Sequence, residues 1–322
     1  MSDLQQYLDI LSCPNCFDSF RQATNNLVNC DQCNVTLEFK KGILAKENNS
    51  HYSVSFGLQW NKFKKTQLDS FTGATRSLNR FIDESGWDQE NLSGKWVLDA
   101  GCGAGRFAEV AHDLGAKLVA IDASSAIYVA SENLNSSETL FIKSDLAATP
   151  MKSETFKYIY CIGVLQHTSN PKEILYELLR LLEKDGEIVL TFYENQGFRT
   201  KLYSKYLVRP ITKRISPKIL LRTIEITSKI WFPITRVLFS LPFPWGKLFS
   251  FLIPVANYVD FHYPTRGLAL QESILDTFDM LSPKFDNPLK KSEIREWVEN
   301  SDFNMMELRV NVTKGTLKFK KI

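Results

Sequence analysis

The chain has 322 residues, 44% of them apolar and 23% charged, and its 39 basic and 36 acidic residues leave a formal net charge of +3. That length is enough for one full α/β domain with accessory segments. The small net charge hides an uneven distribution of charge along the chain, which is described below.

The N-terminal 45 residues contain two C-x-x-C pairs, separated by 13 residues. Two such pairs at short separation are typical of a tetrahedral site in which four thiolates bind one zinc ion. A set of disulfides is disfavoured, because no secretion signal is present. A metal would also explain how a short segment with few large apolar residues folds. We therefore expect a zinc ribbon over residues 1–45, with structural Zn²⁺ bound by Cys13, Cys16, Cys30 and Cys33.

Residues 46–93 are expected to hold a linker and helices that precede the main domain. Lys46 to Ser53 is polar enough for the linker, and Phe56 to Phe63 begins the expected helices. Trp60 has two interpretations: it forms a wall of a ligand pocket, or it packs a helix on the sheet.

The most informative stretch is Val97 to Arg106, with the sequence V-L-D-A-G-C-G-A-G-R. An apolar run ends in Asp99, three glycines follow at alternate positions, and a helical pattern begins at Phe107. Glycine is needed where the backbone turns sharply and approaches a ligand with no Cβ in the way. The first turn of the following helix offers unpaired N–H groups to a polar ligand. The spacing differs from the G-x-G-x-x-G of dinucleotide-binding proteins, which disfavours a pyrophosphate site.

Three further strands are expected after this glycine loop. Lys117 to Ile121 leads to Asp122, which stands where a carboxylate can accept hydrogen bonds from a ribose diol. Leu140 to Lys143 is followed by S-D-L, and Tyr158 to Gly163 by V-L-Q-H-T. Strands that alternate with helices predict a parallel sheet with the ligand at the carboxyl ends of the strands.

These motifs, in this order, resemble the class I S-adenosylmethionine-dependent methyltransferases over roughly residues 94–195. The V-L-Q-H loop resembles the small-molecule members of that family. The resemblance implies that Asp122 binds the ribose and that Asp145 faces the adenine amino group. The implied S-adenosylmethionine site comprises Asp99, Gly101, Gly103, Gly105, Asp122, Ala123, Asp145, Leu146 and Cys161.

The resemblance and the pattern together predict a doubly wound α/β fold with a mostly parallel, seven-stranded sheet over residues 94–322. Ser124 and Ser292 are expected to cap helices, and Pro171 to begin another. The last three strands are expected at Glu187 to Tyr193, Met305 to Val312 and Thr316 to Lys320.

Two other resemblances refine the family. Leu8 to Pro14 and Phe39 to Ile43 resemble the zinc-ribbon family of methyltransferase-activating proteins. The D-T-F-D sequence from Asp276 to Asp279, with the S-P-K-F-D-N-P that follows it, resembles a set of bacterial methyltransferases linked to surface-polysaccharide or secondary metabolism. The D-T-F-D carboxylates have two interpretations: they face a substrate hydroxyl, or they cap turns beside prolines.

Residues 198–262 are expected to form a basic, aromatic and helical insert after the fifth strand. Residues 198–259 hold 11 Lys or Arg and a single acid, Glu225, so the rest of the chain has 28 basic and 35 acidic residues. Its longest uncharged run, Leu248 to Val259, has 12 residues, whereas a membrane span needs about 20. Three interpretations stay open: a lid over the active site, a lid that also contacts an anionic membrane, and a nucleic-acid surface.

Methyl transfer from a sulfonium is an in-line displacement to which an enzyme contributes mainly by positioning the acceptor. With a hydroxyl acceptor, a general base helps the transfer. His167, just past the fourth strand, is the candidate for that base, and the alternative is that it orders the loop or the cofactor. His262 is a second candidate base.

We therefore expect an enzyme that methylates a small-molecule or lipid-linked acceptor, such as a sugar hydroxyl, with S-adenosylmethionine as donor. One alternative is an RNA base methyltransferase, which the excess of acidic over basic residues in the ribbon disfavours. Another is a non-catalytic partner of a methyltransferase, which the intact Asp99, Asp122 and Asp145 disfavour. The absence of a targeting signal predicts a cytoplasmic protein. Peripheral contact with the inner face of the membrane is a further expectation. Nucleic acid is not expected as a partner. The sequence carries no indication of oligomeric state.

Overall fold

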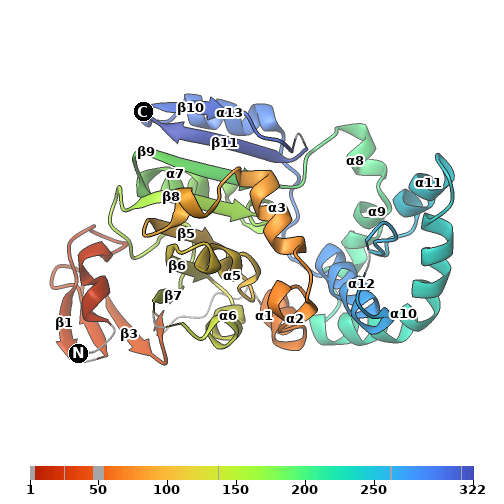
Figure 1. The fold of residues 1–322 in the computed structure, drawn as a ribbon, viewed down its shortest axis with the longest axis horizontal. Helices are drawn as coiled ribbons and strands as arrows, with labels where there is room; N and C mark the ends of the chain where they lie inside the picture. Colours follow the sequence, from red (N-terminus) through yellow and green to blue (C-terminus); the bar gives the residue numbers. More distant parts are fainter. Residues whose placement is uncertain (1–3, 25, 46–53, 137, 262, 313) are drawn as a thin grey trace.

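One eleven-stranded sheet runs through the computed structural model of the chain (Figure 1). The order of its strands is β1-β2-β3-β4-β7-β6-β5-β8-β9-β11-β10. The linker expected at 46–53 and the candidate base His262 lie outside the described residues. The structure describes residues 4–24, 26–45, 54–136, 138–261, 263–312 and 314–322.

The part of the sheet formed by residues 94–322 has the parallel core that the sequence predicts. Strand β5 lies at its centre, with the carboxyl ends of β5, β6, β7 and β8 at one edge. Strand β11 runs antiparallel to both β9 and β10. The strands are β5 (Trp96–Ala100), β6 (Lys117–Asp122), β7 (Thr139–Lys143), β8 (Phe156–Ile162), β9 (Leu182–Thr191), β10 (Met305–Leu308) and β11 (Thr316–Lys321).

The prediction of seven strands is wrong for the sheet as a whole, because the N-terminal segment adds four more. After η1 (Gln5–Ile10), the antiparallel strands β1 to β4 end in a parallel pairing between β4 and β7, with Ile43 opposite Phe141. Ile43 and Leu44 are buried there, and β4 covers an edge of the main sheet that would otherwise be unpaired. The added strands are β1 (Arg21–Thr24), β2 (Leu27–Asn29), β3 (Thr36–Lys40) and β4 (Ile43–Ala45).

Helices cover both faces of the main sheet. On one face α7 packs on alternate strand residues such as Leu98, together with α13. On the other face α3 and α5 pack on residues such as Val97, and α6 lies beside them. The helices are α1 (Val54–Lys62), α2 (Asp69–Thr72), α3 (Arg76–Ser85), α4 (Gln89–Leu92), α5 (Arg106–Asp113), α6 (Ala126–Leu134), α7 (Pro171–Leu181) and α13 (Lys291–Glu299).

Pro171 begins α7 as predicted, but two predicted helix caps are displaced. The residue at the N-cap of α6 is Ser125, whose side chain makes no capping hydrogen bond. The Ser124 hydroxyl accepts from the N–H of Ala126 at 3.1 Å and donates to Asp122 at 2.6 Å, so it links the helix start to the loop before it. The N-cap of α13 is Lys290, so Ser292 lies inside the first turn. Both helices keep the positions in the fold that their apolar patterns predict.

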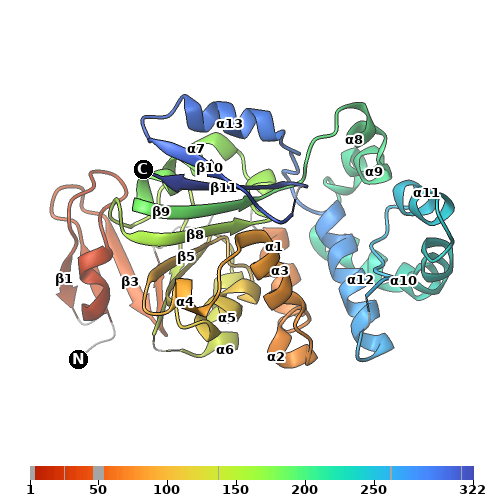
Figure 2. The same cartoon turned by 45° about the horizontal axis from the view of Figure 1, so that its top comes forward.

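The insert is helical, as predicted, and lies at the end of the molecule opposite the N-terminal strands (Figures 1 and 2). A cluster of apolar side chains, including Leu221 and Phe278, joins α10 to α12. Within the described ranges, no helix has both the length and the apolar character that crossing a membrane requires. The helices here are α8 (Phe198–Leu202), α9 (Ser204–Thr212), α10 (Pro217–Phe239), α11 (Trp245–Leu252) and α12 (Arg266–Leu281).

Candidate functional site

The glycine loop connects β5 to α5 through backbone conformations that other residues rarely adopt. Gly101 has φ +88° and Gly103 has φ +54°. A Cβ at position 101 would lie 2.5 Å from a methyl group of Val164, which is closer than any real contact. Gly101 is therefore required both by its φ and by the close approach of the loop after β8.

Asp122 is the last residue of β6, and its carboxylate binds the glycine loop by a hydrogen bond. One carboxylate oxygen accepts from the backbone N–H of Gly103 at 2.9 Å. The other accepts from the N–H of Ser124 at 2.8 Å and from its hydroxyl. Three hydrogen bonds thus hold the carboxylate in a fixed orientation beside the loop, which suits a group that must position a ligand.

A cavity of about 770 Å³ opens beside this loop. That volume lies within the range of about 300–1,000 Å³ typical of small-molecule sites. Its walls come from the glycine loop, the ends of β6 and β8, α1, the insert and α12, and Trp60 of α1 forms part of them. Of the predicted site residues, it is lined by Gly101, Gly103, Asp122, Ala123, Leu146 and His167.

Four other predicted cofactor residues are not among the described residues that line the cavity. Gly105 is the N-cap of α5, where its φ of +89° turns the chain into the helix. Asp145 accepts a hydrogen bond from the N–H of Ala147 at 3.0 Å, in the loop after β7. Cys161 is fully buried within β8, and Asp99 is buried at the end of β5. These residues shape the strands and loops around the cavity.

Asp99 lies directly beneath the loop in an apolar setting. Its burial raises the pKa of the carboxyl to about 8, with a further contribution from the charge of Asp122. The carboxyl is therefore protonated near neutral pH. Tyr160 of β8 is its cross-strand partner.

His167 ends the short helix η3 (Leu165–His167) and is 6% exposed. Its Nδ1 lies 3.1 Å from the carbonyl oxygen of Phe285, and its ring packs against those of Phe56 and Tyr193 at centroid distances of 5.4 and 5.5 Å. A carbonyl can only accept, so Nδ1 donates to it, and the neutral tautomer with this hydrogen bond leaves Nε2 without a proton. That tautomer is the one a general base requires.

A polar cluster beside the cavity joins α5, the pre-core segment, the insert and α12, and of its members only the D-T-F-D carboxylates were singled out from the sequence. The guanidinium of Arg106 donates to Ser77 at 3.0 Å and to Gln67 at 3.3 Å, and burial lowers its pKa to about 10. Asp276 accepts from the Tyr258 hydroxyl at 2.6 Å, and burial raises its pKa to about 7. The D-T-F-D sequence signalled Asp276 and Asp279, and the structure places both on the cavity wall.

A second buried cluster ties the insert to the segment after α12. Lys205 of α9 donates to Asp286 at 3.1 Å, and its ammonium lies 4.0 Å from the ring centre of Tyr193. Asp286 also accepts from the hydroxyl of Tyr206 at 3.3 Å. Lys205, Tyr193 and Tyr206 all line the cavity. Sequence reasoning counted Lys205 only as part of the insert's charge, because its partner is 81 residues away.

The four N-terminal cysteines come together in two turns of matching geometry. In the first turn the N–H of Phe17 donates to the carbonyl of Cys13 at 2.8 Å. In the second turn the N–H of Asn34 donates to the carbonyl of Cys30 at 2.9 Å, at the same spacing of four residues. Phe17 and Asn34 both have positive φ, of 61° and 54°. The two C-x-x-C pairs are therefore equivalent knuckles, each presenting two sulfur atoms.

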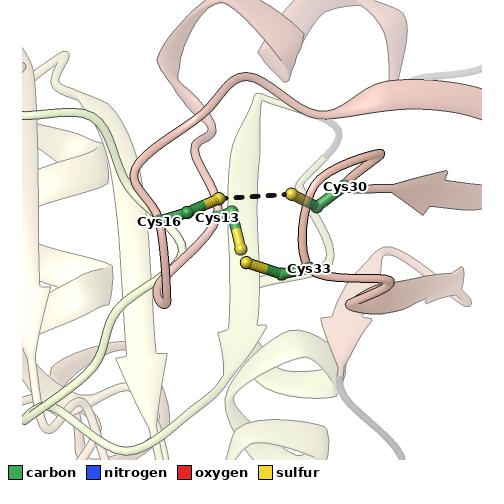
Figure 3. Close-up of side chains that lie close together, drawn as sticks. All are labelled: Cys13, Cys16, Cys30 and Cys33. Carbon is green, nitrogen blue, oxygen red and sulfur yellow. Dashed lines mark hydrogen bonds between the residues drawn. The ribbon is translucent and has the colours of Figure 1, made fainter.

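The sulfur atoms of Cys13, Cys16, Cys30 and Cys33 point toward one another (Figure 3) and all lie within 4.8 Å of one another. Those of Cys16 and Cys30 are 3.4 Å apart. A zinc–sulfur distance of about 2.3 Å places tetrahedral sulfur ligands about 3.8 Å apart. None of the four is in a disulfide. The donor set and its spacing fit a tetrahedral metal ion.

Comparison with known proteins identifies the central part of the chain. Residues 98–190 match the family described as a methyltransferase domain, which confirms the prediction of such a domain. The chain is 30% identical over 165 residues to the mitochondrial ubiquinone biosynthesis O-methyltransferase of Schizosaccharomyces pombe, across 47% of this chain and 60% of that protein. It is 33% identical over 116 residues to the tRNA U34 carboxymethyltransferase of Colwellia psychrerythraea, across 32% and 35%.

The similarity is confined to part of each relative. The chain spans 60% of the S. pombe protein and 50% of a ubiquinone biosynthesis O-methyltransferase of Coxiella burnetii. The solved structure of magnesium protoporphyrin IX methyltransferase from Synechocystis, with bound S-adenosylhomocysteine, is 14% identical and aligns with a TM-score of 0.43 over 84% of this chain and 97% of that one.

Proposed function

We propose that the protein transfers a methyl group from S-adenosylmethionine to an oxygen of a small-molecule or lipid-linked acceptor. The observation that carries this proposal is the glycine loop held by Asp122 at the wall of the cavity. The family match over residues 98–190 begins at this loop and includes Asp122.

Several residues fit the donor. When bound, S-adenosylmethionine supplies an electrophilic methyl group on a sulfonium. Gly101 and Gly103 let the loop pack closely against Val164 and Trp60 at the cavity wall. Asp122 offers a carboxylate to a ribose diol. Ala123 and Leu146 complete the wall nearby. Asp99, Gly105, Asp145 and Cys161 support this site from the surrounding strands and turns.

The acceptor end of the cavity is polar and carries both kinds of charge. His167, Asp276 and Lys205 line it and can hold a hydroxyl by hydrogen bonds. His167 is the proposed general base, through its Nε2. The S. pombe and C. burnetii relatives are O-methyltransferases, which favours an oxygen acceptor here. A sugar hydroxyl is the acceptor that we propose.

The cysteine cluster is proposed to bind a structural Zn²⁺. Its four thiol groups leave no open position for a substrate, which is the arrangement of structural rather than catalytic zinc. The cluster belongs to the N-terminal strands, which lie at the opposite end of the molecule from the insert (Figure 1). The ion would stabilise the strands that extend the sheet.

The direct test is calorimetric titration of the zinc-loaded protein with S-adenosylmethionine, beside the variants Asp122→Ala and Asp83→Ala. Asp83 is an exposed aspartate of α3 and serves as the matched control. We expect micromolar binding by the wild type and Asp83→Ala, and at least about tenfold weaker binding by Asp122→Ala, since hydrogen bonds to a charged group contribute about 1.5–3 kcal/mol. Absence of binding by the wild type would overturn the enzyme assignment and favour a non-catalytic partner of another methyltransferase.

A further inference from the structure

Helix α10 carries apolar side chains on two opposite faces. On the first face, Leu220, Leu221 and Ile224 are buried in the cluster shared with α12. On the second, five apolar residues recur at helical spacing and are between 42% and 67% exposed. An apolar stripe on a helix normally faces a core or another apolar surface. The exposed face consists of Ile219, Ile226, Ile230, Ile234 and Val237.

The neighbouring helices also expose large apolar side chains. Phe198 of α8 is 75% exposed, and Phe243, just before α11, is 80% exposed. Of the 23 large apolar side chains that are exposed in the described part of the chain, 17 lie between residues 198 and 258. Scattered exposed apolar residues are ordinary, but such a concentration marks an interaction site. The apolar insert surface is defined here as the five α10 residues with Phe198, Leu202, Phe243, Trp245, Leu248 and Leu252.

Cations without acidic partners surround the apolar insert surface. Of the 11 basic residues in 198–259, Lys205 and Arg209 are buried and the other nine are exposed. None of those nine forms an ion pair with another described residue, and the sole acid, Glu225, pairs with Lys62. On α10 the basic residues occupy the flank next to the apolar stripe. They are Lys218, Arg222, Lys229 and Arg236.

Two of the helices that carry the apolar insert surface, α8 and α11, also contribute to one wall of the cavity. Arg199 and Tyr203 line it from the α8 side, and Lys247 and Phe251 line it from α11. The rings of Tyr203 and Phe251 stack with their centres 5.5 Å apart, so α8 and α11 meet at the cavity. The part of the apolar insert surface on α8 and α11 therefore lies on helices that also contribute to the cavity wall.

We propose that the apolar insert surface docks on an anionic lipid bilayer and that the cavity takes an amphiphilic acceptor from that bilayer. Apolar side chains flanked by unpaired cations match the interior and the headgroups of an anionic membrane interface. A second copy of this chain matches less well, because its own exposed cations would repel the first set across a symmetric contact. The choice of acceptor rests on the proposed function, whereas the docking does not.

The test is co-sedimentation of the full chain with vesicles of phosphatidylcholine alone and of phosphatidylcholine mixed with phosphatidylglycerol. The stripe variant combines Ile219→Gln, Ile226→Gln and Ile230→Gln, and its control combines Phe71→Gln and Met306→Gln, which are exposed elsewhere. The charge variant combines Lys218→Gln, Arg222→Gln and Lys229→Gln, and its control combines Lys40→Gln and Lys184→Gln.

We expect the wild type and both controls to bind the anionic vesicles at low salt, with at least about tenfold weaker binding by the stripe and charge variants. Raised salt should weaken binding further. Equal binding by the stripe variant and the wild type, or no binding to anionic vesicles by the wild type, would overturn the docking. A wild-type dimer that the stripe variant converts to a monomer, without vesicle binding, would overturn it in favour of a contact between copies.

The docking and the proposed function fail separately. Calorimetric titration with S-adenosylmethionine reports on the donor site, and sedimentation reports on the surface. Vesicle binding without cofactor binding would support the docking and overturn the enzyme assignment. Cofactor binding without vesicle binding would support the donor site and overturn the docking.

Discussion

Asp99 and Tyr160 are direct partners across the parallel strands β5 and β8, and both are buried beneath the glycine loop. Burial raises the pKa of each group, and for Asp99 the value is about 8. The floor under the loop is therefore a protonated carboxyl next to a phenol, whereas the carboxylate of Asp122 holds the loop from the cavity wall. Two neighbouring aspartates thus have different roles because one is buried and the other is held at the cavity wall.

The protonated state of Asp99 predicts a specific pH dependence of stability. In the unfolded chain an aspartate loses its proton near pH 4, whereas folded Asp99 keeps it up to about pH 8. Its contribution is therefore full below about pH 4 and falls by at most about 1.4 kcal/mol per pH unit as the pH rises to about 8. Asp99→Asn removes this titration. Urea unfolding at about pH 5 and about pH 7.5 should show a gain of the variant relative to the wild type at the higher pH; parallel pH profiles would contradict the buried, protonated carboxyl.

Gly101→Ala should disrupt the loop by a combination of strain and steric clash. Alanine at this position would have to adopt φ +88°, and its Cβ would lie 2.5 Å from Val164. We therefore expect the free energy of unfolding to fall by about 1–3 kcal/mol and S-adenosylmethionine to bind at least about tenfold more weakly. Gly73→Ala is a matched control, since Gly73 has φ +68° with nothing within 4 Å of its Cβ position. Adding Val164→Ala to Gly101→Ala should restore part of the binding. Equal affinities of Gly101→Ala and Gly73→Ala would show that Val164 does not constrain the loop.

The sequence predicts the central fold well because its signals there are local. The glycine loop, the strand ending at Asp122 and the helix beginning at Pro171 each combine a hydrophobic run with a specific turn or cap residue. The seven strands of the main domain follow from these signals. Local signals do not predict the pairing of β4 with β7, because that pairing joins residues about 100 positions apart.

The polar side of the cavity illustrates the same limit. Asp276 and Asp279 were singled out by the D-T-F-D sequence, but their two interpretations could be separated only by seeing which way α12 faces. The partnership of Lys205 with Asp286 joins the insert to a segment beyond α12. Such pairings depend on how the insert folds back, which neither spacing nor composition encodes.

Removal of metal should unfold the N-terminal strands and weaken the main sheet. We expect one zinc ion per chain by metal analysis. Because η1 and the knuckles share a core with the main domain, chelation should lower the apparent Tm by about 5 °C or more. Cys33→Ser should lose the zinc. Cys161→Ala removes a buried thiol far from the knuckles in sequence and should keep the full zinc content. Zinc bound equally by both variants would exclude the four-cysteine site.

His167→Ala should separate catalysis from donor binding. The imidazole lines the cavity with Nδ1 on the Phe285 carbonyl, so its loss removes the unprotonated Nε2 that can take a proton from a hydroxyl acceptor. We expect turnover to fall at least about 100-fold, within the range for loss of a general base, while S-adenosylmethionine affinity stays within about twofold. The measurement is transfer of tritiated methyl groups to an acceptor found by screening, beginning with lipid-linked sugars. His112→Ala, on the outer side of α5, is the control and should leave turnover unchanged. Near-normal turnover by His167→Ala would remove His167 from the proton transfer, and a matching loss of donor affinity would assign it to the cofactor instead.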